Sequence, residues 1–175
     1  NRMMNLLLNR IYRSIKIDPE VFDEVQKDKN ATITAGVVVV LSSLAAGIGA
    51  SHFGAVNFFL APVLSLVAWF MWAYIVFFIG VKLFPDPKTK ATHMGLLRSI
   101  GFSSAPGMIR ILGFNQDLMT VVFIGSAFWM LACMVVAVKQ TLNYKSLWKA
   151  LGVVVIAWLT QAFLLIIILV STKNF

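Results

Sequence analysis

The sequence lacks most of the residues that enzymes use for chemistry. Among 175 residues there are one cysteine (Cys133), two histidines and seven acidic residues. A single cysteine excludes a disulfide framework, and so few possible ligands give no cluster suited to a metal ion. The sequence contains neither a phosphate-binding glycine loop nor a nucleophile-elbow motif. We therefore expect no catalytic residue, no metal site and no cofactor, and we interpret the chain as non-enzymatic.

Charge is also scarce, while apolar residues are abundant. Only 13% of the residues are charged, 59% are hydrophobic, and the mean hydropathy is +0.85. Soluble domains are about one quarter charged and about half apolar, so this composition excludes an ordinary soluble domain and a disordered chain. The 15 basic residues exceed the seven acidic ones. In a membrane protein this excess fits loops that face anionic lipid, so we expect membrane lipids as partners and no nucleic acid.

Long uncharged runs predict an all-α, polytopic membrane bundle. The run between Lys29 and Lys82 contains no charged residue and is long enough for two spans of about 20 residues each. Two later uncharged runs are each long enough for one more. The four spans predicted in this way cover residues 32–50, 58–84, 118–138 and 150–172.

A fifth, shorter element lies between Arg98 and Arg110 and contains Pro106. Proline removes a backbone donor and crowds the preceding turn, so we expect this third helix to be kinked. It spans the bilayer if the two arginines snorkel to opposite interfaces. A re-entrant element is the alternative.

The distribution of basic residues bears on the number of spans. With five spans, nearly all of the 15 Lys and Arg residues fall on one side of the membrane, and with four spans slightly fewer do. Both arrangements place the N-terminus in the cytoplasm by the positive-inside rule. Five spans fit slightly better.

The segment 1–30 is predicted to form cytoplasmic or interfacial helices ahead of a membrane domain at 31–175. Residues 1–16 have the pattern of an amphipathic helix, with Arg10 and Arg13 on a basic face suited to lipid phosphates. Such a helix shapes membranes or, alternatively, anchors the bundle. A second, acidic helix should start at Asp18, and it either presents an exposed Phe22 to a partner or is simply solvated.

Small residues gather near Pro106 and in two of the spans. In lipid they allow helices to approach closely, and bundle packing is their ordinary role. A sharper hypothesis is that the third helix holds a lipid headgroup through the arginines at its ends. The candidate lipid or partner contacts are Arg10, Arg13, Phe22, Arg98, Pro106 and Arg110.

Three blocks of sequence resemble the Yip1 domain family in its compact prokaryotic form, over roughly residues 21–165. They are an Asp-x-Asn-Ala-Thr entry that begins at Asp28, a Leu-Arg-x-x-Gly-Phe-Ser-x-x-Pro block that ends at Pro106, and an Ala-Val-x-Gln-x-Leu-x-Tyr turn that ends at Tyr144. In the last block Lys139 stands where the family pattern leads us to expect arginine, a change that keeps the charge and loses bidentate pairing.

The resemblance implies a five-span bundle with a cytoplasmic N-terminus. It also implies the cytoplasmic membrane of a prokaryote, or the Golgi and endoplasmic reticulum in a eukaryote. Eukaryotic relatives are similar to Rab GTPase-interacting proteins, but their long soluble N-terminal region is not seen in this sequence. A small GTPase partner therefore rests on family analogy alone.

Two functions remain open from the sequence. The first is a scaffold or accessory subunit that packs against other membrane proteins, or against itself, and helps to organise the bilayer. The alternative is a small lipid or solute transporter that uses the proline-kinked third helix.

Overall fold

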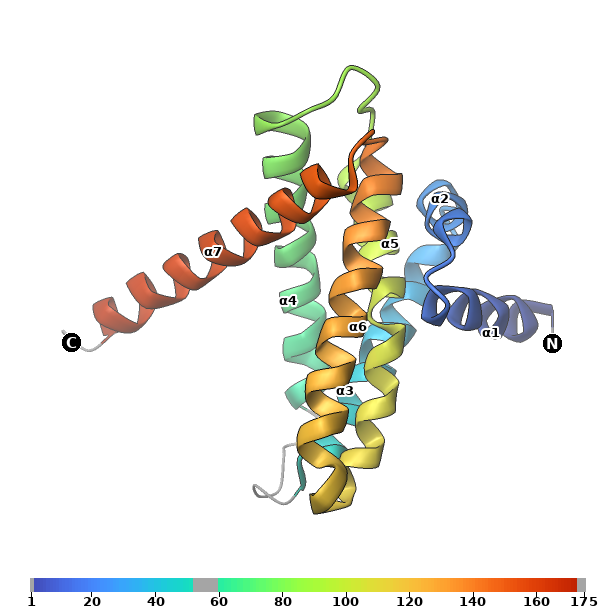
Figure 1. The fold of residues 1–175 in the computed structure, drawn as a ribbon, viewed down its shortest axis with the longest axis vertical. Helices are drawn as coiled ribbons and strands as arrows, with labels where there is room; N and C mark the ends of the chain where they lie inside the picture. Colours follow the sequence, from blue (N-terminus) through green and yellow to red (C-terminus); the bar gives the residue numbers. More distant parts are fainter. Residues whose placement is uncertain (1, 52–59, 173–175) are drawn as a thin grey trace.

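The computed structural model describes residues 2–51 and 60–172, which form helices joined by short connections (Figure 1). Two short helices precede the bundle. The elements are α1 (Arg2–Ile15), α2 (Pro19–Lys27), α3 (Ala31–Gly49), α4 (Leu60–Phe77), the π-helix η2 (Phe78–Leu83), α5 (His93–Ser103), the 3₁₀-helix η3 (Ala105–Phe114), α6 (Gln116–Leu142) and α7 (Leu147–Thr172).

Four helical segments are long and apolar enough to cross a membrane, which confirms the four spans predicted from uncharged runs. They are Ala31–Gly49, Leu60–Leu83, Gln116–Leu142 and Leu147–Ile168. The turn between the first two lies outside the described residues.

Local sequence signals account for several helix ends. The Asp18 side chain accepts a hydrogen bond from the Glu20 amide and Pro19 opens α2, as predicted. The second span ends at Leu83, just before Pro85. At the end of α6, Asn143 adopts a left-handed conformation (φ 53°), which is a common way to terminate a helix.

The third element differs in form from the prediction. An α-helix ends at Ser103, and after a turn at Ser104 a 3₁₀-helix with Pro106 in its first turn runs to Phe114. A 3₁₀-helix rises about 2.0 Å per residue against about 1.5 Å for an α-helix, so α5 and η3 together extend about 36 Å. The two segments lie alongside α6 and reach the end of the bundle where α3 also ends (Figure 1).

Helix α7 belongs to the bundle only over its first part. Its buried residues recur at helical spacing on one face: Ala150, Val153, Val154 and Ala157. Beyond them the helix diverges from the other helices, on the side opposite α1 (Figure 1). Every side chain described from 163 to 170 is exposed. Part of the space between α4 and α6 is therefore not covered by α7.

The two N-terminal helices pack on the bundle. The Trp129 indole N–H of α6 donates to the Ile15 carbonyl at 2.8 Å, and the Cys133 thiol contacts the Ser14 carbonyl at 3.3 Å. On α2, the side chains of Val21, Phe22 and Val25 are fully buried in the same core as the membrane helices. The alternative of a solvated second helix is therefore wrong, because its apolar face lies against α5 and α6.

Candidate functional site

The six residues singled out from the sequence separate into two groups. Arg10, Arg13, Phe22 and Arg98 converge where α2 packs on α5, whereas Pro106 and Arg110 lie on η3. The structure therefore does not bring all of the predicted contacts into one site.

The basic face of α1 is turned to the acidic face of α2. Arg10 is only 5% exposed; its Nε lies 2.8 Å from Glu24 Oε1 and its Nη2 lies 2.8 Å from Asp28 Oδ2. Arg13 bonds Asp18 at 2.7 Å and Glu24 at 2.8 Å. The expectation that this face lies on lipid phosphates is corrected, because carboxylates of the same chain already occupy both guanidinium groups.

These ion pairs also set the charge state of the acids. The hydrogen bond from Arg13 holds the pKa of Asp18 below its ordinary value, and the hydrogen bond from Arg10 does the same for the pKa of Asp28. Both carboxylates are therefore kept in the charged form that pairs with α1.

Phe22 and Arg98 connect α2 to the bundle. The Phe22 side chain is fully buried, and its carbonyl accepts a hydrogen bond from Ser99 Oγ at 3.1 Å. The expected exposed phenylalanine is therefore wrong. Arg98 is 7% exposed and donates to the Gln26 carbonyl at 2.6 Å and to Thr32 Oγ1 at 2.8 Å. It thus stabilises the last turn of α2, whose carbonyls lack partners within the helix.

Arg110 has a different environment. Its Nη2 lies 2.7 Å from Ser42 Oγ and 3.2 Å from the Ser42 carbonyl, and its Nε donates to the Gly107 carbonyl at 3.0 Å. All of these acceptors are neutral. In the part of the chain that the structure describes, Arg110 takes part in no ion pair.

The side chain of Arg110 runs inward rather than outward. Its backbone carbonyl lies against Gly49, the last residue of α3, while its guanidinium reaches Ser42, about 10 Å back along that helix. The Arg110 side chain therefore points along α3 towards the interior of the bundle, and not outward as snorkelling would require. Ser42 offers two acceptors in the interior, and the end of α3 leaves no space beside Gly49.

Glycines make this close contact possible. A Cβ atom on Gly107 would lie 2.2 Å from Ser42 Oγ and 2.6 Å from Arg110 Nη2, and one on Gly49 would lie 1.9 Å from the Arg110 carbonyl oxygen. Only residues without a side chain fit at both positions. The small residues near Pro106 therefore do pack helices together, as the sequence indicated.

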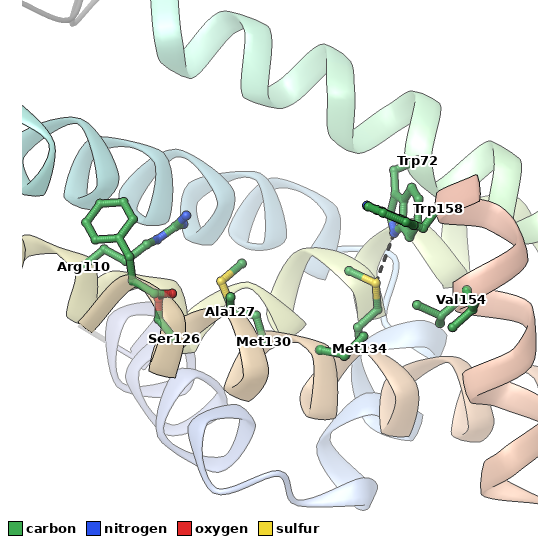
Figure 2. A pocket seen from close by; sticks show the side chains of 11 residues that line it. Trp72, Arg110, Ser126, Ala127, Met130, Met134, Val154 and Trp158 are labelled. Carbon is green, nitrogen blue, oxygen red and sulfur yellow. Dashed lines mark hydrogen bonds between the residues drawn. The ribbon is translucent and has the colours of Figure 1, made fainter. Parts of the chain in front are cut away.

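An apolar groove begins at Arg110 and continues between α4, α6 and α7. We call it the Arg110 groove; its volume is about 570 Å³, and its floor is formed by the α6 residues Ser126, Ala127, Met130 and Met134. Figure 2 shows Arg110 at one end and Trp72, Val154 and Trp158 at the other. The groove is open at its side, since Trp158 is 63% exposed.

A second hollow adjoins it where α4, α5 and α7 approach one another. This hollow, the Gln161 recess, has a volume of about 350 Å³ and contains the polar side chains of Ser65, Ser104 and Gln161. The two hydroxyls donate within their own helices, to Pro62 and Gly101. Among the described residues, the Gln161 amide has no hydrogen-bond partner.

Another cluster of side-chain contacts, which the sequence analysis did not predict, holds the start of α7 in place. The Tyr144 hydroxyl lies 2.7 Å from the Gly80 carbonyl and 2.8 Å from the Phe84 carbonyl, and Lys149 pairs with Asp86. Burial and the nearby Asp86 carboxylate raise the pKa of Tyr144 to about 12. The hydrogen bond from Lys149 lowers the pKa of Asp86. The only signal in the sequence was the Tyr at the end of the 137–144 block.

The arrangement offers two hollows that could bind a ligand or a partner. Among the described residues, no group of three or more His, Cys, Asp or Glu side chains could hold a metal ion. These hollows are the Arg110 groove, with its guanidinium at one end, and the Gln161 recess, with its side-chain amide.

Comparison with known proteins gives one result. The family model of the Yip1 domain matches residues 14–169, nearly the whole chain, which confirms the resemblance inferred from the three sequence blocks. No curated protein and no solved structure matches.

Proposed function

The chain belongs to the Yip1 domain family and is a membrane protein, and from this premise we propose that it is a non-enzymatic scaffold or accessory subunit of a membrane protein complex. Its partner is a membrane-spanning helix of another protein, which lies along the diverging part of α7. The helix presents a hydrogen-bonding side chain to Gln161.

The unpaired amide of Gln161 carries this proposal. Gln161 lies about 20 Å along α7 from Leu147, in the middle of an apolar span. An amide without a partner in hydrocarbon costs several kcal/mol, and polar side chains in membranes therefore associate across helices. The exposed side chains described between 163 and 170 provide the apolar surface next to such a contact.

The proposed topology has five spans and a cytoplasmic N-terminus. The length of α5 and η3, about 36 Å together, is sufficient for a hydrocarbon core of about 30 Å. The positive-inside rule favours the same arrangement. It places the α1–α2 ion pairs and the Tyr144 cluster on the cytoplasmic side.

The same topology suits a role in organising the bilayer surface. With Arg10 and Arg13 turned to α2, helix α1 leaves an exposed strip of Met3, Met4, Leu8 and Tyr12. A helix with such an apolar strip lies in the membrane interface.

The experiment compares Gln161→Leu with Thr160→Val in the full chain, after gentle extraction from the membranes in which it is made. Thr160 is the matched control because its hydroxyl bonds the Ile156 carbonyl of its own helix. Native mass spectrometry should find a complex of fixed stoichiometry with another membrane protein for the original chain and for Thr160→Val, and not for Gln161→Leu. A lone protomer for the original chain would overturn the proposal, and a dimer of this chain would replace it with self-association.

One observation favours the second candidate, a small lipid or solute transporter. The Arg110 groove is open at its side and is bordered by η3, which has Pro106 in its first turn. For a transporter, Ala127→Trp, which fills the groove, should stop transfer of a labelled lipid between vesicles. Unchanged transfer by that variant would exclude this route.

A further inference from the structure

The Arg110 groove combines a half-buried cation with an apolar channel. The guanidinium contacts only neutral oxygens, and of its nitrogens Nη1 has no hydrogen-bond partner among the described residues. Beyond it the lining is dominated by aromatic, aliphatic and methionine side chains. A volume of about 570 Å³ falls in the range of roughly 300–1,000 Å³ that is typical of small-molecule sites.

On the proposed five-span topology Arg110 lies inside the membrane, where a charge without a counter-charge is costly. The arginines near α2 pair with carboxylates or lie close to one, since Arg98 contributes to lowering the pKa of Asp28. Arg110 has no such partner among the described residues, and the acid closest to it in sequence, Asp117, is exposed. A cation inside a membrane is ordinarily paired or faces a polar ligand. A bound anion would supply the counter-charge that Arg110 lacks among the described residues.

We propose that the Arg110 groove binds an anionic phospholipid, with the phosphate on the Arg110 guanidinium and an acyl chain along Met130 and Met134 towards Trp72. A guanidinium binds phosphate oxygens through paired, charge-assisted hydrogen bonds. Methionine side chains adapt to a flexible chain. The open side of the groove lets a lipid enter directly from the bilayer.

The lipid site does not depend on the partner helix proposed for Gln161. A lipid site is compatible with both candidate functions. In a scaffold the bound lipid is a fixed component, and in a transporter it is the cargo. The two proposals fail separately, because Gln161→Leu leaves Arg110 and its acceptors in place.

Native mass spectrometry of the purified full chain tests the site with defined lipids. The probes are dioleoyl phosphatidic acid, dioleoyl phosphatidylcholine and inorganic phosphate. The chain should retain phosphatidic acid over phosphatidylcholine by roughly tenfold, the size expected for one charge-assisted contact. Equal retention of the two lipids would overturn the proposal. Retention of inorganic phosphate alone would make this a site for free anions and would also overturn it.

Variants then assign the binding to the groove. Arg110→Leu should reduce retention of phosphatidic acid to the level of phosphatidylcholine, and Arg110→Lys should restore part of it. Ala127→Trp fills the floor of the groove from an exposed position and keeps the Arg110 contacts, so it remains informative if Arg110→Leu does not fold. Its control is Val121→Trp, which is 71% exposed and lies on the opposite face of α6. Retention unaffected by Ala127→Trp would contradict the proposal.

Discussion

Three buried or half-buried arginines show how one residue type takes different roles in this chain. Arg10 pairs with two carboxylates, Arg98 stabilises the end of α2, and Arg110 reaches neutral oxygens beside an apolar groove. The sequence identified all three as candidates. It did not identify their partners, because the acceptors on Glu24, Gln26 and Ser42 lie on other helices, and only the packing of those helices brings them within reach.

The α1–α2 ion pairs lead to a pH prediction. The folded-state pKa of Asp18 and of Asp28 is lowered by the arginines, so their stabilising effect is present above the ordinary pKa of 3.8 and is lost as the pH falls through the lower folded-state value. The protection of the α1 and α2 amides from hydrogen exchange, relative to an unfolded peptide at the same pH, should therefore fall below about pH 4. Protection in α3 and α6 should remain high. A uniform loss of protection in all helices would contradict this account.

A substitution tests the same contact at neutral pH. Asp28→Asn removes one of the two carboxylates on Arg10, and we expect the docking of α1 to weaken by about 1–3 kcal/mol, the effect of losing a hydrogen bond to a buried charge. Hydrogen exchange of α1 measures this loss. Lys27→Ala is the control, because Lys27 is largely exposed and its pair with Asp23 should contribute little. Equal effects of the two substitutions would show that burial of Arg10 does not matter.

At the level of helices, η3 is the element that the sequence described least well. Pro106 correctly indicated a change in the helix, but a proline pattern favours a kink or a break and does not predict a 3₁₀-helix of ten residues. Runs of this length are uncommon. Helix η3 lies in a narrow space between α3 and α6, and its backbone approaches Gly49 too closely for any side chain there. Tertiary packing therefore decides its form.

The packing of η3 can be tested at its glycines. In Gly107→Ala the new Cβ would meet Ser42 Oγ, Arg110 Nη2 and the Met130 sulfur, so we expect a loss of about 1–3 kcal/mol in stability from overpacking. Gly125→Ala is the matched control, since nothing lies within 4 Å of its added Cβ. It should be neutral or slightly stabilising because alanine favours a helix. Thermal unfolding in detergent, followed by tryptophan fluorescence, measures both, and equal midpoints would contradict the close contact.

For the whole molecule, the sequence predicted the helical class, the four long apolar spans and the family. Long uncharged runs indicate the spans, because apolar side chains favour the bilayer and the polar backbone must then satisfy its own hydrogen bonds, as it does in a helix. The sequence did not predict that α7 diverges from the bundle. The buried face of its first part and the exposed side chains described between 163 and 170 are both apolar, so hydropathy does not distinguish a side chain that faces another helix from one that faces lipid.

The central claim of this account is that α5 and η3 cross the membrane together, since this places Arg110 inside the bilayer and returns α6 to the cytoplasmic side. Labelling of a single introduced cysteine tests this crossing. In a Cys133→Ser background, Asp117→Cys adds a thiol at the start of α6, and Lys145→Cys adds one just after its end. Both positions are exposed. An impermeant maleimide should label position 117 from outside sealed, right-side-out vesicles and position 145 only after the vesicles are opened. Labelling of position 145 from outside, with position 117 protected, would mean four spans and would contradict the account.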